Sequence, residues 1–149
     1  MDSPGARRTI RQAATGDAGA VRELYGAGEA EEFARRLADR HTAPGTTHYV
    51  VESDGQIVAA FALTALGRLR PGGKVRLMLH EIKLRPSYRG TSVAEDILGW
   101  LASGLGVGTE RELLTLAPLG QQPSSFQRFG LTESHQAFKW PVRDGGIPT

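Results

Sequence analysis

Two short stretches of the sequence carry residues whose types and spacing could do chemistry. In the first, His80 and Glu81 stand side by side in an alternating apolar run from Leu77 to Leu84. Histidine titrates near neutral pH and carboxylates also act as general bases, so either residue could take a proton from a bound substrate. In the second, Arg89 heads a run of small residues that ends at Ala94, where apolar residues at helical spacing begin.

Alternation along the first stretch predicts which side chains share a face of a strand. The two predicted faces consist of Met78, His80, Ile82 and Leu84, and of Leu77, Leu79, Glu81 and Lys83. His80 is then either a general base or a hydrogen-bonded core histidine. We rank Glu81 second as a base, because a carboxylate on the opposite face should lie under a helix or pair with a basic side chain.

The run of small residues suits a helix start that binds an anion. It consists of Gly90, Thr91, Ser92, Val93 and Ala94. A helix start exposes unpaired N–H groups and the positive end of the helix dipole, so a phosphate can bind there without side chains. Arg89 would add a charge-assisted hydrogen bond, and the hydroxyl of Ser92 either contacts the phosphate or hinders it. The alternative is a plain turn between a strand and a helix.

The composition is that of a globular protein with one domain over residues 1–149, and we expect flexible ends at 1–8 and 143–149. Apolar residues make up 40% and charged residues 23% of the 149 positions. The absence of cysteine excludes disulfides, thiolate metal sites and cysteine nucleophiles. The four histidines lack the spacing of metal ligands, so we expect no metal.

The charge and hydropathy patterns exclude two classes of partner. The net charge is +2 and the basic residues are scattered, whereas a nucleic-acid surface usually shows a clustered basic stripe. No apolar run approaches the roughly 18 residues of a membrane helix, and the N-terminus does not have the pattern of a secretory signal. We therefore expect a cytoplasmic protein that binds neither nucleic acid nor membrane.

Hydrophobic periodicity predicts an α/β (α+β) domain with a mixed, mostly antiparallel sheet and helices on both faces. Asp17 is the expected N-cap of the first helix, and the pair Asp54-Gly55 predicts a tight hairpin. The strand, helix and strand between 75 and 116 predict one parallel pair. The expected strands cover 9–13, 48–52, 57–63, 74–84, 113–116 and 136–142, and the expected helices cover 17–25, 29–40, 92–104 and 124–128.

The segment from Leu84 to Ala94 resembles the acyl-CoA-binding motif of the GCN5-related N-acetyltransferases. Proline and an aromatic residue follow a strand, and Arg89 and Ala94 fill the first and last positions of Arg/Gln-x-x-Gly-x-Gly/Ala. Ser92 stands where the family usually has its middle glycine. The element order over residues 8–142 is also similar to that of this family.

This resemblance implies an acetyl-CoA-dependent N-acetyltransferase that acts by direct transfer on a small-molecule amine. Acetyl-CoA, the acyl donor, would place its diphosphate on the amides of residues 90–94. Its pantetheine arm would pair with Ile82, Lys83 and Leu84 where the two parallel strands separate into a cleft. The pattern His80-x-Ile82-x-Leu84 is similar to that of the arylalkylamine acetyltransferases, in which a histidine at this place helps to remove the amine proton. A strand amide near Ile82 would stabilise the oxyanion.

A second segment, from Ser125 to Leu131, resembles the family motif Phe-Tyr-x-x-x-Gly-Phe. Phe126 stands at the tyrosine position and cannot protonate the departing thiolate, so it should line the pantetheine channel or the core. Ser125, or its neighbour Ser124, would replace that proton donor. The alternative function is a catalytically degenerate module that binds acyl-CoA or a partner.

The end of the chain bears on the acceptor and on assembly. The family's final hairpin is abbreviated after Leu131, which leaves either an open sheet edge or a site completed by a second subunit in a homodimer. His48, His135 and Trp140 are candidates for lining the acceptor pocket.

Overall fold

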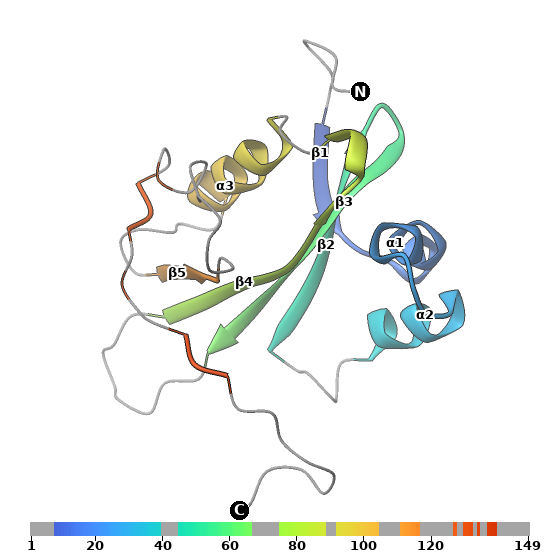
Figure 1. The fold of residues 1–149 in the computed structure, drawn as a ribbon, viewed down its shortest axis with the longest axis horizontal. Coiled ribbons are helices and arrows are strands. Elements are labelled where there is room, and N and C mark those ends of the chain that lie inside the picture. Colours follow the sequence, from blue (N-terminus) through green and yellow to red (C-terminus); the bar gives the residue numbers. More distant parts are fainter. Residues whose placement is uncertain are drawn as a thin grey trace, which may run out of the picture.

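The described residues form a five-stranded sheet with helices on both faces (Figure 1). The sheet is mixed and mostly antiparallel, as predicted. The computed structural model describes residues 8–39, 45–66, 75–88, 92–104, 111–116, 127, 130–132, 134 and 137–139. The strands lie in the order of the chain, and the first three pairings are antiparallel whereas the fourth is parallel. They are β1 (Arg8–Gln12), β2 (Thr46–Ser53), β3 (Gln56–Leu66), β4 (Val75–Leu84) and β5 (Arg111–Thr115).

The helices divide between the two faces of the sheet (Figure 1). Two helices, α1 (Ala18–Tyr25) and α2 (Ala30–Ala38), cover one face, and α3 (Val93–Gly104) covers the other. Two short 3-10 turns precede α1 and α3, namely η1 (Thr15–Asp17) and η2 (Pro86–Tyr88). None of the helices among the described residues is long and apolar enough to cross a membrane.

The hairpin between β2 and β3 confirms the prediction from the Asp-Gly pair. Asp54 and Gly55 both have positive φ angles, of 52° and 78°. This backbone combination matches the twist of two antiparallel strands, and aspartate and glycine adopt it at low cost. The turn fixes the register in which Ser53 faces Gln56.

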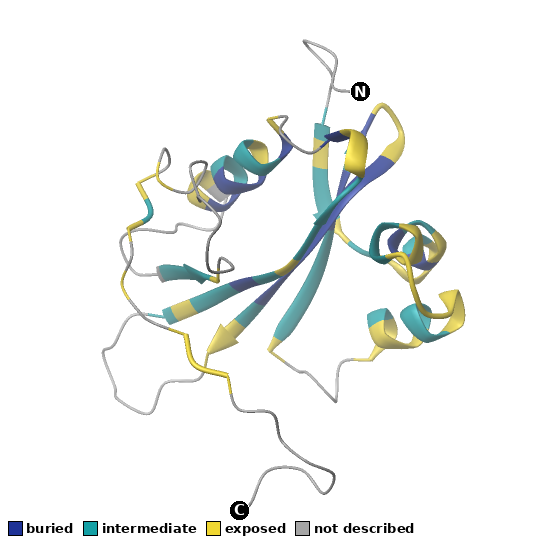
Figure 2. Ribbon diagram, viewed as in Figure 1, coloured by how far each residue is buried: buried dark blue, intermediate teal, exposed yellow. Residues whose placement is uncertain are grey.

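The hydrophobic core is larger on the α3 face of the sheet. Buried residues run along β3 and the inward side of α3 (Figure 2). On this face Phe61 and Leu79 of the sheet pack with Ile97 and Leu101 of α3, and each of the four is at most 2% exposed. The cluster under α1 is smaller, and its buried members are Val21, Val50, Ile57 and Ala60.

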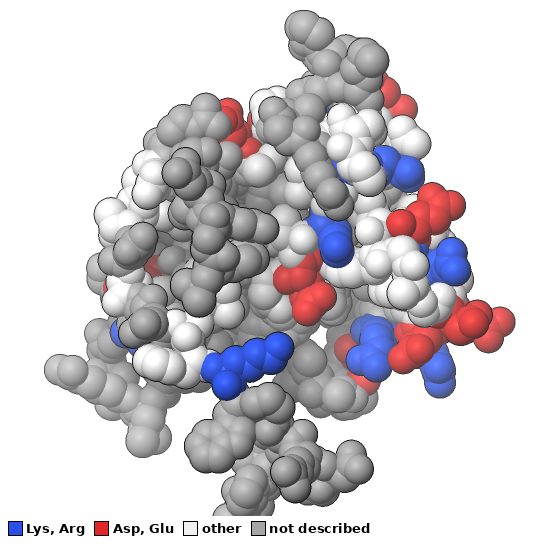
Figure 3. Space-filling model, in the orientation of Figure 1, with Lys and Arg blue, Asp and Glu red and all other residues white. Residues whose placement is uncertain are grey.

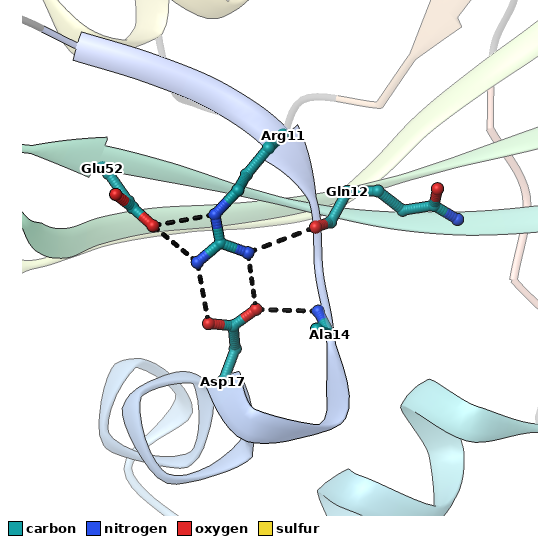
Figure 4. Close-up of polar contacts among 5 residues, drawn as sticks. All are labelled: Arg11, Gln12, Ala14, Asp17 and Glu52. Carbon is teal, nitrogen blue, oxygen red and sulfur yellow. Dashed lines mark hydrogen bonds and ion pairs between the residues drawn. The ribbon is translucent and has the colours of Figure 1, made fainter.

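An arginine clamp fixes the start of α1 to the sheet (Figure 4). Arg11 of β1 donates hydrogen bonds of 2.8 and 2.9 Å to the two carboxylate oxygens of Asp17, and its Nε donates one of 2.8 Å to Glu52. These contacts lower the pKa of Asp17 and raise the pKa of Arg11. Asp17 occupies the N-cap position of α1 but makes no cap hydrogen bond; its carboxylate instead accepts one from the amide of Ala14. The predicted N-cap position is thus confirmed, but the capping hydrogen bond is not formed, and both carboxylate oxygens accept from Arg11 instead.

The two ends of the chain correct two further predictions. Arg8, which was expected in a flexible end, begins β1 and pairs with Ser53. Residues 137–139 are not in a strand, although one was predicted over 136–142. Phe138 is 88% exposed, so no sheet face of the described structure buries it. The predicted helix over 124–128 lies outside the described residues except for the helical Gln127.

Candidate active site

A β-bulge interrupts β4 at the residues predicted to do chemistry. Ala62 of β3 pairs with His80, but Ala60 pairs with Lys83, so β4 holds one residue more than β3 over this interval. Glu81 has a φ of +56°, in the left-handed region that a residue with a side chain adopts only when its surroundings hold it there. The extra residue bends the strand and changes the direction of the side chains that follow.

The bulge overturns the predicted division of side chains between the faces. His80 is in register with Ala62 and, through it, with His48, on the face covered by α1 and α2. Beyond the bulge, Ile82 and Leu84 pack against the core under α3. His80 therefore does not share a face with them, because one inserted residue exchanges the two faces of a strand.

Tyr25 of α1 holds the bulge in place. Its hydroxyl donates a hydrogen bond of 2.5 Å to the backbone carbonyl of Glu81. Burial, and secondly the nearby Glu81 carboxylate, raise the pKa of Tyr25 to about 12, so the hydroxyl keeps its proton at neutral pH. This hydrogen bond thus joins α1 to β4 at Glu81, one of the two candidate bases and the neighbour of the other, His80.

A cavity of about 470 Å³ lies between α1, α2 and this part of the sheet. Its volume falls within the range of roughly 300–1,000 Å³ that is usual for small-molecule sites. His80 and Glu81 both line the cavity, and so does His48. The prediction that Glu81 points away from His80 was therefore wrong, since the bulge brings both candidate bases to one cavity. His48 was predicted to line the acceptor pocket, and its place in this cavity is consistent with that prediction. His135 and Trp140 lie outside the described residues.

The hydroxyl of Thr64, itself hydrogen-bonded to Thr46, holds the ring of His80. Its Nε2 lies 2.6 Å from Oγ1 of Thr64, which lies 2.7 Å from Oγ1 of Thr46. Either partner in each pair can donate, and the tautomer of His80 decides the direction. His80 is thus hydrogen-bonded, as the core alternative expected, but it also lines the cavity. A ring fixed at one nitrogen is well placed for a role as a base.

His48 stands opposite His80 across β3 and is half-buried. Burial lowers the pKa of His48, and the proximity of His80 lowers it further, although the Glu81 carboxylate acts in the opposite direction. His48 is therefore neutral at pH 7. No spacing pattern marks this pair, because 32 positions separate the two histidines and only the register brings them together.

The start of α3 shows what engages Ser92. Its backbone carbonyl accepts a hydrogen bond of 2.9 Å from the amide of Asp96, as at an ordinary helix start. Its hydroxyl accepts one of 2.7 Å from Arg8, which also forms an ion pair with Asp96. The side chain of Val93 is fully buried, so it belongs to the core, and Ala94 is partly buried. The other predicted anion-site residues, Arg89, Gly90 and Thr91, lie outside the described residues, as do Ser125 and Phe126.

The parallel pairing of β4 with β5 ends before the bulge. The two strands are in register from Val75 with Arg111 to Leu79 with Thr115, and the Thr115 hydroxyl donates to the Leu79 carbonyl at 3.1 Å. Over the described part of the chain, β4 continues from 80 to 84 without a partner from β5. This is the stretch along which the pantetheine arm was predicted to lie.

Comparison with solved structures shows that this fold is shared with acetyltransferases. A Trypanosoma brucei acetyltransferase matches with a TM-score of 0.73 and 18% identity, over 91% of this chain and 100% of that one. Glucosamine-6-phosphate N-acetyltransferase from Arabidopsis thaliana matches with a TM-score of 0.70 and 18% identity, over 90% and 98%. An aminoglycoside N-acetyltransferase in complex with CoA matches with a TM-score of 0.69 and 16% identity, over 96% and 99%.

These structural matches define the fold as that of the GCN5-related N-acetyltransferases, as the sequence motif predicted. No protein-family model and no curated protein matches the sequence.

Proposed function

We propose that the protein transfers an acetyl group from acetyl-CoA directly to the amine of a small molecule. The observation that carries this proposal is the bulge in β4. Because of the bulge, the side chains of His80 and Glu81 line the same cavity. Both residues lie just beyond Leu79, where the described pairing of β4 with β5 ends. The acetyltransferase fold supports the same assignment.

Acetyl-CoA would bind along the far end of β4 and the start of α3. Its diphosphate would lie on the amides of residues 90–94 with Arg89 beside it, and its pantetheine arm would pair with the backbone of Ile82, Lys83 and Leu84. Phe126 would line this channel. The Arg8 guanidinium beside Ser92 neutralises Asp96, which would otherwise repel an anion at this helix start.

In the transfer step, the amine nitrogen attacks the thioester carbonyl carbon and the carbon–sulfur bond breaks. His80 accepts the proton that the amine loses, and the backbone amide near Ile82 stabilises the oxyanion. The departing thiolate carries the electron pair of the broken bond and takes a proton from solvent or from Ser125. Glu81 is the second candidate for the base, and its place in the same cavity supports keeping it.

Calorimetric titration with acetyl-CoA tests the donor site. We expect saturable binding. The Kd should rise about tenfold in Arg89→Ala, because this variant loses one charge-assisted hydrogen bond to a phosphate. The matched control is Arg76→Ala at the other end of β4, where the side chain is exposed and pairs with Glu112 at 3.2 Å. Absence of binding to the wild-type protein would contradict the proposed function.

A second candidate function is a module that binds acyl-CoA without turnover. Phe126 favours it, because phenylalanine cannot protonate a thiolate. Release of free CoA in the presence of a panel of amines separates the two functions, since a pure binding module releases none.

A further inference from the structure

A pair of threonines lies beside His80 because of the register of three strands. Thr46 of β2 faces Thr64 of β3, and His80 of β4 faces Ala62, two residues before Thr64. Such diagonal neighbours on antiparallel strands share a face and lie within reach of a long side chain. The small side chain of Ala62 leaves the imidazole ring room to lean toward Thr64. The strands thus bring the ring and two hydroxyls into one hydrogen-bonded chain.

This chain gives the two ring nitrogens of His80 different roles. Nε2 lies 2.6 Å from Oγ1 of Thr64, and this is the one side-chain hydrogen bond of His80 within the described part of the molecule. His80 lines the cavity, whereas Thr64 is not among the described residues that line it. The ring nitrogen that can meet a ligand in the cavity is therefore Nδ1.

The direction of the chain follows from what a base must do. When the ring takes up a proton, both of its nitrogens are donors. Oγ1 of Thr64 must then accept from Nε2, so its own proton points to Oγ1 of Thr46, 2.7 Å away. In the neutral ring, the same direction leaves the proton on Nε2 and a lone pair on Nδ1. The opposite direction puts the proton on Nδ1, and both hydroxyls would have to turn before His80 could accept another.

The charged groups around the imidazole ring do not impose the opposite tautomer. Glu81 could attract a proton to Nδ1, but its side chain is exposed, so water weakens that attraction. From α2, Asp39 and Arg36 line the cavity with opposite charges, and acidic and basic side chains are mixed over α1 and α2 (Figure 3). The lowered pKa of His48 keeps that residue neutral at pH 7. The direct hydrogen bond with Thr64 is left to select the tautomer.

We propose that Thr64, supported by Thr46, is a positioning residue that keeps the proton of neutral His80 on Nε2 and presents the Nδ1 lone pair to the amine. This inference rests on the proposed acetyl transfer and adds two residues to its site. In the transfer step the amine proton passes to Nδ1, and the Nε2 proton stays on the ring. The hydrogen bond from Nε2 to Thr64 then becomes charge-assisted and stabilises the imidazolium. His80 afterwards returns the Nδ1 proton to solvent.

The tautomer of His80 tests this inference without any turnover. In protein labelled with ¹⁵N at histidine, protonated and unprotonated ring nitrogens have distinct chemical shifts in NMR spectra. The signals that are missing from His80→Gln identify His80. We expect the neutral ring in the wild-type protein to carry its proton on Nε2, and Thr64→Val to reduce the population of that tautomer. A proton on Nδ1 in the wild type, or an unchanged population in Thr64→Val, would overturn the inference.

Initial rates of acetyl transfer measure what the hydrogen bond contributes to catalysis. The acceptor is whichever of ethylamine, phenethylamine, glucosamine-6-phosphate and neamine the wild-type protein acetylates fastest. Thr64→Val should lower kcat about tenfold, the usual effect of losing one hydrogen bond to a charged group, with the KM for the amine within about twofold of wild type. Thr64→Ser keeps the hydroxyl and should restore kcat to within about twofold of wild type. Thr46→Val should lower kcat about threefold, because it acts only through Thr64.

The matched control is Thr47→Val, the next residue of β2. Successive side chains of a strand point to opposite faces, so Thr47 lies on the face away from His80, where it is in register with Leu63. A wild-type kcat in Thr64→Val, or no recovery in Thr64→Ser, would overturn the role of Thr64 and leave acetyl transfer standing. Absence of acetyl transfer by the wild-type protein would overturn the proposed function, and with it the role of Thr64.

Discussion

The two faces of the sheet are built differently, although the same strands supply both. Under α3, large apolar side chains such as Phe61, Leu79 and Leu101 are excluded from solvent. Under α2, no residue of the helix is buried, and a cavity lined by His48 and His80 remains between helix and sheet. One face thus holds the larger buried core, and the other leaves room for a ligand. The bulge at Glu81 separates the two sets of side chains along β4. His80, before the bulge, lies on the cavity face, whereas Ile82 and Leu84, after it, pack on the α3 face.

The largest expected effect compares one leucine from each face. Leu101→Ala should lower the free energy of unfolding by about 3 kcal/mol, because Leu101 is 1% exposed and its removal leaves a void in a closed core. Leu37→Ala, on the half-buried wall of the cavity, should lower it by less than about 1 kcal/mol. Urea denaturation measures both variants. Equal losses would mean that the two faces do not differ as described.

The arginine clamp under α1 should make the cavity face sensitive to acid. Asp17→Asn should lower the free energy of unfolding at pH 7 by about 2 kcal/mol, since the Asp17 side chain is only 12% exposed and accepts two hydrogen bonds from Arg11. The folded-state pKa of Asp17 lies below its ordinary value of 3.8. The contribution is therefore full above that value and is lost as the pH falls through the folded-state pKa.

Denaturation at a series of pH values checks this expectation. The gap between wild type and Asp17→Asn should narrow as the pH falls below about 4. Asp54→Asn in the hairpin turn is the control, because asparagine also tolerates its φ of 52° and no clamp is lost. A gap that stays constant down to low pH would show that the carboxylate charge of Asp17 does not stabilise this face.

The smallest expected effect concerns the hydroxyl that holds the bulge. Tyr25→Phe should lower the free energy of unfolding by about 1 kcal/mol, the usual contribution of one hydrogen bond. Because the folded-state pKa of Tyr25 is raised to about 12, this contribution is full below the ordinary value of 10 and is lost as the pH rises toward 12. Tyr88→Phe, in the core under α3, is the comparison on the other face. An equal kcat in wild type and Tyr25→Phe would show that the hydroxyl does not position the bulge for catalysis.

The sequence predicted the features of the fold that depend on local patterns. Helical periodicity from Val93 and the Asp54-Gly55 pair each specify a local backbone shape, and both predictions were confirmed. The parallel pairing of β4 with β5 follows from the connection between them, which contains a helix, and was also confirmed.

The sequence could not predict how distant residues interact around the cavity. No glycine marks the bulge, because Glu81 itself holds a positive φ with Tyr25 bonded to its carbonyl. Alternation alone therefore assigned Ile82 and Leu84 to the wrong face. The bond between His80 and Thr64 likewise depends on the register of β3 with β4, which follows from the bulge.

The central claim is that the amine loses its proton in this cavity. Measuring the rate of acetyl transfer in His80 variants tests this claim most directly. His80→Ala removes the ring, and His80→Gln can keep a hydrogen bond to Thr64 but cannot act as a base. We predict that kcat falls about 100-fold in both variants, while the Kd for acetyl-CoA stays within about twofold of wild type. An unchanged kcat in His80→Gln would contradict the account and remove His80 from the mechanism.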